Sequence, residues 1–217
     1  MERVKHAQLL KAEKIKDKFD AQSVDESHFE MYLSIYKHEQ MVEVWVRDVN
    51  SSSTFKMVSQ YPFCKFSGKL GPKRQENDYQ IPEGLYYINR FNPKSKFHLS
   101  LGLNYPNESD KILGDKFPGY DIFIHGGCNT VGCVPITDTE IKELYVIADR
   151  ARSYGQNDIP VYMFPFKMTD ENFSEYSEKF PEHSEFWSKL KKAYDKLDNV
   201  HTFLQYKVDE KGAYKIL

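Results

Sequence analysis

Residues 122–133, IFIHGGCNTVGC, join a strand-like apolar run to a glycine-rich loop with two cysteines. The bulky run Tyr120–Ile124 predicts a buried strand that ends at His125. Glycines permit backbone angles that a side chain would forbid, so the chain can fold back and bring the Cys133 thiol beside the imidazole. These glycines are Gly126, Gly127 and Gly132.

Cys133 can supply a thiol nucleophile, and His125 can supply the base that activates it. A free thiol has a pKa of about 8.5 and is mostly protonated at neutral pH unless an imidazole or a helix N-terminus lowers that value. Thr137-Asp138-Thr139-Glu140 has the pattern of a capping box, and the residues after it predict a helix from Thr137 to about Arg152. Backbone N–H groups near Cys133 can then face an oxyanion.

Two other interpretations of the loop stay open from these residues. Cysteine is often buried, so Cys133 can be a packing residue. His125, Cys128 and Cys133 can also act as three zinc ligands, in a spacing that loosely resembles a metal knuckle. No Cys-x-x-Cys or His-x-x-x-His pair follows, and Cys64 is far away in the sequence, so we expect no metal and no cofactor.

Several ordered motifs accompany the loop. They are Gly68-Lys69, Asp78, Pro82-Glu83-Gly84-x-Tyr86, Asn92-Pro93-x-Ser95-x-Phe97-x-Leu99-Ser100-Leu101, Tyr105-Pro106-Asn107 with Asp110, and Leu144-Tyr145. Together with His125-Gly126 and Thr130-x-Gly132-Cys133, they resemble the YkuD-type L,D-transpeptidase catalytic domain family and its YafK-like branch. The resemblance covers roughly residues 30–165.

The resemblance implies an α+β fold, with a mixed β-sandwich or barrel-like catalytic domain and a few peripheral helices. It also implies a peptidoglycan L,D-transpeptidase of cell-wall biogenesis, in which Cys133 attacks a stem-peptide amide and an amine resolves the thioester. His125 is then the general base and later the acid, and the carbonyl of Gly126 or Gly127 orients its ring. The N–H groups of Gly132 and Cys133 are the implied oxyanion hole.

The loop also departs from the broad family pattern. Cys133 follows His125 by eight positions, whereas many members have a longer insertion there. Val131 stands where many have a polar residue, and Pro135 stands where many have arginine or asparagine, which weakens the usual carboxylate contact. Two alternatives stay open: a hydrolase (L,D-carboxypeptidase or amidase) with the same Cys-His pair, and a catalytically silent cell-wall-binding module.

Four polar residues are weaker candidates for substrate contact. They are Tyr105, Asn107, Ser100 and Thr130. Ser100 belongs to the run 97–103, where apolar and polar residues alternate as they do in a half-buried strand. Its position therefore has a structural explanation as well.

Composition fits an enzyme-sized domain, since 217 residues with 40% hydrophobic content can bury one substantial core. A net charge of −2 without a basic stripe argues against nucleic-acid binding. We find neither an apolar run long enough for a membrane helix nor a signal peptide in the charged opening MERVKH. A periplasmic or cell-envelope location thus assumes a removed or omitted signal sequence, and such a compartment permits a Cys64–Cys128 disulfide.

We expect three parts in the chain. Residues 1–27 form an N-terminal helical brace, 28–167 the catalytic domain, and 168–217 a C-terminal helix-strand extension on the same domain. The contact face of the brace is predicted to carry Leu9, Ala12, Ile15 and Phe19. The predicted strands are 29–36, 41–46, 54–58, 84–89, 97–103, 122–124, 160–164 and 202–208, with loops at 48–53 and 69–79 and a further helix at 186–197.

Overall fold

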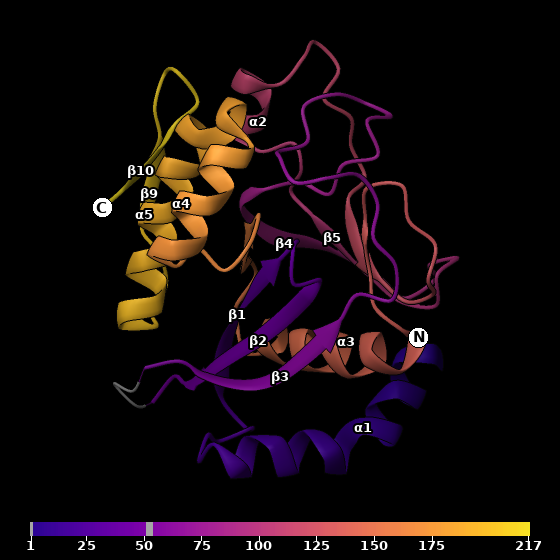
Figure 1. The fold of residues 1–217 in the computed structure, drawn as a ribbon. Coiled ribbons are helices and arrows are strands. Elements are labelled where there is room, and N and C mark those ends of the chain that lie inside the picture. Colours follow the sequence, from indigo (N-terminus) through magenta and orange to yellow (C-terminus); the bar gives the residue numbers. More distant parts are fainter. Residues whose placement is uncertain (1, 51–53) are drawn as a thin grey trace.

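An eight-stranded mixed sheet forms the centre of the molecule (Figure 1). The structure is a computed structural model and describes residues 2–50 and 54–217. The strands of the sheet are β1 (Phe29–Tyr36), β2 (Met41–Asp48), β3 (Lys56–Pro62), β4 (Gly84–Asn92), β5 (Ser100–Leu103), β6 (Phe123–His125), β7 (Val134–Pro135) and β8 (Ile159–Phe164). Their order is β3-β2-β1-β8-β4-β5-β6-β7, in which β1 with β8 and β6 with β7 are the parallel pairs.

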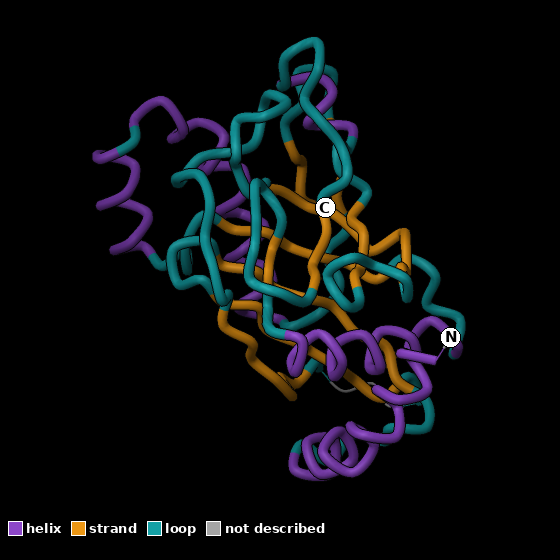
Figure 2. The backbone as a smooth tube through the Cα atoms, turned by 90° about the vertical axis from the view of Figure 1, so that its right-hand side faces the viewer, coloured by secondary structure: helices purple, strands orange, loops and turns teal. Residues whose placement is uncertain are grey.

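Helices and a small hairpin pack against this sheet. They are α1 (Glu2–Ala21), α2 (Glu108–Leu113), α3 (Asp138–Ser153), α4 (Asp170–Lys179) and α5 (Ser184–Val200), the 3-10 turn η1 (Pro181–His183), and the hairpin strands β9 (Tyr206–Val208) and β10 (Tyr214–Ile216). The fold class is α+β, as the sequence predicted, and Figure 2 shows how the sheet curls. Among the described residues, no helix has an apolar stretch of the length that crossing a bilayer requires.

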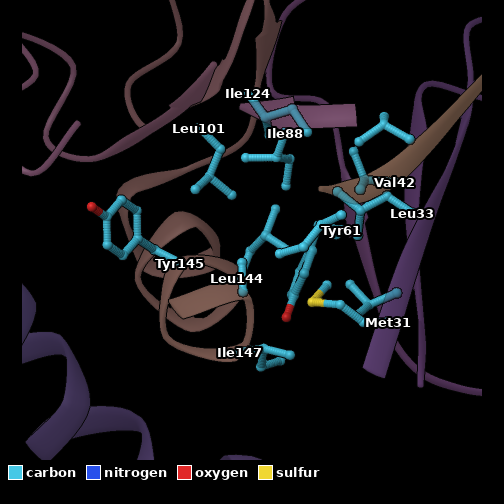
Figure 3. Close-up of a cluster of buried hydrophobic side chains, with 14 of the residues drawn as sticks. Met31, Leu33, Val42, Tyr61, Ile88, Leu101, Ile124, Leu144, Tyr145 and Ile147 are labelled. Atoms are coloured by element: carbon cyan, nitrogen blue, oxygen red, sulfur yellow. The ribbon is translucent and has the colours of Figure 1, made fainter. Parts of the chain in front are cut away.

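Both faces of the sheet are covered. In Figure 1, α3 lies across one face with α1 outside it, whereas α4, α5 and the hairpin lie on the other side. Alternate residues of β1 pack on the two faces of the sheet, because successive side chains of a strand point to opposite faces. Met31, Leu33 and Ile35 join the cluster under α3, and Tyr32 and Tyr36 join the cluster under α5. Figure 3 shows the first cluster, where Leu144 of α3 lies close to Ile88 and Leu101.

Most of the predicted elements are confirmed, with shifted ends. The predicted strands at 29–36, 84–89 and 160–164 are β1, β4 and β8, and the predicted helices are α3 and α5. The strand predicted at 97–103 is wrong in its first half, because His98 has a φ of +67°, outside the extended region that a strand requires. The strand predicted at 202–208 shortens to β9, and the patterns did not predict α2, α4, β7 or β10. The loop predicted at 48–53 lies partly outside the described residues, and Asp48 itself ends β2.

The N-terminal helix is confirmed as α1, and its predicted contact face is right for Ile15 and Phe19 but wrong for Leu9 and Ala12. The buried residues are Ala7, Lys11, Ile15 and Phe19, whereas Leu9 is 83% exposed. The reason is electrostatic: Glu143 of α3 is buried under α1 and forms ion pairs with three lysines of this helix. Lys11 is therefore buried at this contact, whereas Lys14 reaches Glu143 from the solvent side.

Candidate active site

The glycine-rich loop begins and ends on neighbouring strands. His125 is the last residue of β6, and Cys133 directly precedes β7, which pairs with β6 through Ile124 opposite Val134. Gly132 has a φ of +127°, which glycine adopts without the steric penalty of a Cβ atom. The strand pairing brings the two ends of the loop to the same edge of the sheet.

His125 is buried and is held by its own loop. Its Nδ1 lies 2.6 Å from the carbonyl oxygen of Gly126. Because a carbonyl only accepts hydrogen bonds, Nδ1 carries the ring proton and Nε2 is the nitrogen without one. Burial lowers the pKa of His125, and the bond to Gly126 opposes this shift. The imidazole is therefore neutral at physiological pH, which is the state that a proton acceptor needs.

Cys133 is the free cysteine among the described residues, and it is partly exposed. Its Sγ donates toward the carbonyl oxygen of Asp121 at 3.7 Å. Burial raises the pKa of the Cys133 thiol and the charge of Asp121 adds to this, whereas a backbone hydrogen bond from Phe123 and the charge of Lys73 lower it. The thiol is thus protonated in the resting protein, and the thiolate forms only when a base removes the proton.

Two hollows meet at Cys133. The first, of about 280 Å³, is lined by His125 and Cys133 together with Ser100 and Phe97, and the Phe97 and His125 ring centres are 4.6 Å apart. The second, of about 200 Å³, lies on the Val131 side of Cys133. A larger hollow of about 680 Å³ shares Asp121 with both in its lining. The thiol is therefore accessible from two sides.

The other two cysteines form a disulfide. Cys64 follows β3 and is bonded to Cys128, in the middle of the loop, with a Cα–Cα distance of 5.4 Å. The backbone N–H of Cys64 also donates to Pro135 at 3.0 Å, so the segment after β3 is attached to the loop and to β7. Cys128 is consequently not available as a zinc ligand, and the described residues contain no group of three His, Cys, Asp or Glu side chains that could hold a metal.

Thr130 and Gly132 form contacts within the loop. Thr130 Oγ1 donates to the carbonyl of Cys133 at 2.7 Å and accepts from the N–H of Gly132 at 3.2 Å. Thr130 therefore fixes the conformation that presents the thiol. The Gly132 N–H, a predicted oxyanion donor, is already bonded, which leaves the N–H of Cys133 as the candidate.

The remaining predicted contact residues are divided between two regions. Ser100 pairs with His125 across β5 and β6 and lines the first hollow. Tyr105 and Asn107 lie instead along the 680 Å³ hollow, away from Cys133. Asn107 also has a structural role, because its side chain caps α2 through the N–H of Asp110 and donates to Leu85 and Tyr214. The Tyr105 hydroxyl donates to the carbonyl of Pro118 at 2.8 Å.

Comparison with known proteins places the chain in a family. A model of the YkuD family, the L,D-transpeptidase catalytic domain, matches residues 30–163. The chain belongs to this family. The residues 30–165 that carried the resemblance in the sequence coincide with the matched YkuD domain, so the predicted membership is confirmed.

Relatives of the YkuD domain support the same assignment. Over 167 residues the chain is 32% identical to the proteins named "Putative L,D-transpeptidase YafK" of Escherichia coli K12 and O157:H7. The match covers 76% of this chain and 65% of those proteins, so the chain spans just under two thirds of the curated relatives' length. The crystal structure of the helical cell shape determining protein Pgp2 of Campylobacter jejuni has a TM-score of 0.51 at 14% identity, over 88% of this chain and 91% of that one. This likeness concerns the fold.

Asp121 and Arg90 are residues of the YkuD domain that sequence reasoning missed. Arg90 Nη1 lies 2.6 Å from Asp121 Oδ1; Asp121 lines all three hollows, and Arg90 lines the largest. The only signal was a charged residue directly before the predicted strand at 122–124. The placement of Asp121 depends on its backbone φ of +59°. A positive φ at an aspartate cannot be predicted from the sequence.

Proposed function

We propose that this chain is a peptidoglycan L,D-transpeptidase that forms a thioester on Cys133 with stem peptides, in the periplasm or cell envelope. Membership of the YkuD family supports the substrate class. The observation that carries the mechanism is the shared hollow of Cys133 and His125, with Nδ1 of the histidine bonded to Gly126. A protonated thiol and a neutral imidazole in one hollow are the reactants for general-base catalysis.

The first half-reaction moves one proton and makes one bond. Nε2 of His125 takes the thiol proton as Sγ attacks the amide carbonyl, and the Cys133 N–H stabilises the oxyanion of the tetrahedral intermediate. The imidazolium then protonates the amine that leaves as the C–N bond breaks, which yields a thioester and neutral His125. The Gly126 carbonyl has the role of a neutral orienting group, because it fixes the tautomer without adding a charge.

The second half-reaction decides between transfer and hydrolysis. An acceptor amine attacks the thioester and gives its proton to His125, and the collapse of the intermediate expels the Cys133 thiolate, which takes that proton back. The two hollows on either side of Cys133 favour transfer, because the acyl group and an acceptor amine can approach from different directions. Attack by water would instead give a carboxypeptidase or an amidase.

Defined muropeptides test this proposal. The protein is incubated with a tetrapeptide donor, with and without an amine acceptor, and the products are separated by mass. Cross-linked dimers are expected, Cys133→Ala should lower turnover by about 10⁴-fold or more, and Cys133→Ser should retain the fold with little activity. Trimmed monomers alone would assign hydrolysis, and unchanged substrate together with no Cys133 adduct after carbapenem treatment would count against any thioester chemistry.

The pH dependence of kcat/KM gives a second test of the same pair. Activity requires neutral His125, so it is lost as the pH falls through the histidine pKa. Because burial lowers that pKa, the acid limb should lie below about 6.5, the ordinary value for histidine. An acid limb above that value would show that His125 is not the base of the free enzyme.

A further inference from the structure

The buried side of α1 leads to the candidate active site. Arg3 lies four residues before Ala7, on the same side of the helix as the buried Ala7, Lys11 and Ile15. Its Nη1 donates to two backbone carbonyls at 2.7 Å each, those of Ser95 and His98. Both carbonyls belong to residues 95–98, the turn that precedes β5.

Residues 95–98 cover His125. The Phe97 ring stands 4.6 Å from the imidazole, centre to centre, and Ser95, Lys96 and Phe97 line the hollow that contains Cys133. The backbone of the turn is also close to the loop: a Cβ atom added at Gly126 would lie 2.9 Å from the Phe97 carbonyl oxygen. A movement of this turn would therefore change the surroundings of the imidazole and the orienting Gly126 together.

The turn needs support from outside. His98 has a φ of +67°, which costs a residue with a side chain roughly 1 kcal/mol or more unless its surroundings enforce it. Within the turn, the Ser95 hydroxyl accepts a hydrogen bond from the Phe97 N–H at 3.0 Å. The carbonyl of His98 itself is bound by Arg3. The guanidinium thus spans the turn from one end to the other.

We propose that Arg3 is a positioning residue, which holds residues 95–98 so that the Phe97 ring covers the His125 imidazole and shields it from water. This inference rests on the proposed function for its effect on turnover, but its effect on His125 is a property of the resting protein. Docking of α1 onto α3 is thereby linked to the turn beside the candidate active site, 92 to 95 positions from Arg3 in sequence.

The charges around His125 bear on how its titration is interpreted. Lys96 and Asp121 line the same hollow, and Asp138 accepts a hydrogen bond from Gly127 behind the loop. Removal of Arg3 also deletes a positive charge, which by itself would raise the pKa of a nearby histidine. A charge control on the same helix is therefore required, and Lys5, two residues further along α1 and exposed, provides it.

The first experiment follows the His125 ring resonances by NMR against pH, without substrate. Arg3→Ala should raise the His125 pKa toward the ordinary value, Lys5→Ala should leave it unchanged, and Arg3→Lys should fall between, because lysine keeps the charge but places its donors on a shorter side chain than the Nη1 that binds both carbonyls. In a Phe97→Ala background, Arg3→Ala should add no further shift, since both act through the same ring. Equal shifts in Arg3→Ala and Lys5→Ala, or additive shifts in the double variant, would overturn the proposal.

Turnover is the second readout. Arg3→Ala should lower kcat/KM about three- to tenfold and move its acid limb upward, with little change in the urea midpoint because Arg3 is exposed. If the NMR shift appears but no variant turns over muropeptides, the proposed function fails and the positioning role stands. If muropeptides are turned over with identical profiles in the wild type and in Arg3→Ala, the positioning role fails alone.

Discussion

Glu83 and Glu143 are both buried carboxylates that are paired with lysine. Each attaches a terminal segment of the chain to the central sheet or to the helix on it, but the lysines are arranged differently around the two. Glu83 lies 3.0 Å from Lys37, and both side chains are completely buried. Glu143 forms ion pairs with three lysines of α1, and one of these, Lys14, is 55% exposed. The C-terminal segment is therefore attached inside the protein, and the N-terminal helix at its surface.

The partners of each pair explain the difference. Lys37 Nζ donates to Glu83 and, at 2.7 Å each, to the carbonyls of Gly71 and Ile81, so all three of its donors are used. Trp187 of α5 donates to the other Glu83 oxygen at 2.8 Å. A buried pair of this kind leaves an uncompensated charge when one member is lost, whereas a surface cluster can replace one lysine by another or by water.

The largest effect is expected from Lys37→Met. The substitution leaves Glu83 buried without its cation, which should cost about 3–5 kcal/mol of unfolding free energy, measured as a lower urea midpoint. The double variant Lys37→Met with Glu83→Gln should recover a substantial part of the loss, because no unpaired charge is left. A double variant no more stable than Lys37→Met would contradict the assignment of the cost to burial of charge.

Trp187→Phe should have the next largest effect. It removes the hydrogen bond to Glu83 and part of the indole packing, at about 1–3 kcal/mol. The loss should appear in hydrogen exchange at α5 and less at α1. Uniform loss of protection in both helices would mean that the two attachments are not independent.

Glu143→Gln should have a smaller and more local effect, about 1–2 kcal/mol, because the lysines that lose their partner can reach water. Burial alone would raise the pKa of Glu143, but hydrogen bonds from Lys18, Lys14 and Tyr61 outweigh it and lower the pKa. A lowered carboxyl pKa contributes stability above the unfolded value of about 4.3 that is lost as the pH falls through the folded one.

Limited proteolysis of α1 across acid pH provides the measurement. The wild-type helix should become accessible below about pH 4, before the β-sheet unfolds, and Glu143→Gln should show less of this pH dependence. If α1 and the sheet are released at the same pH, the distinction between the surface and interior attachments fails.

Lys14→Ala should have the smallest effect, at most about 0.5 kcal/mol, because Lys14 is mostly solvated and Lys18 and Lys11 still face Glu143. Its effect should disappear in high salt, as expected for screened surface charges. A loss comparable to that of Glu143→Gln would show that the lysines do not replace one another.

The two glutamates also illustrate what the sequence could predict. Periodic apolar runs located β1, β4, β8, α3 and α5, and the His-loop-Cys motif identified the loop that joins β6 to β7. Hydropathy predicted Ile15 and Phe19 on the contact face of α1 but could not predict Lys11 there, because its burial depends on the buried Glu143 of α3. The pairing of Glu83 with Lys37 could not be predicted either, since the two residues are 46 positions apart and no local pattern connects them.

The site was predictable to a similar extent. Gly126 was one of two carbonyls expected beside His125, and the structure has it at 2.6 Å from Nδ1. Phe97 was expected in a strand, and its position over the imidazole depends on the positive φ of His98 and on Arg3. Such long-range support leaves no periodic signal in the sequence.

The disulfide has a practical consequence for anyone who handles this protein. Assays of cysteine enzymes usually contain a reductant, which keeps the reactive thiol in its active form. Here the same reagent can also open the bond between Cys64 and the exposed Cys128, in the loop that presents Cys133. Under the proposed function, dithiothreitol would keep Cys133 reduced and at the same time loosen the loop that presents it, so muropeptide turnover should be measured against reductant concentration before any preparation is judged inactive.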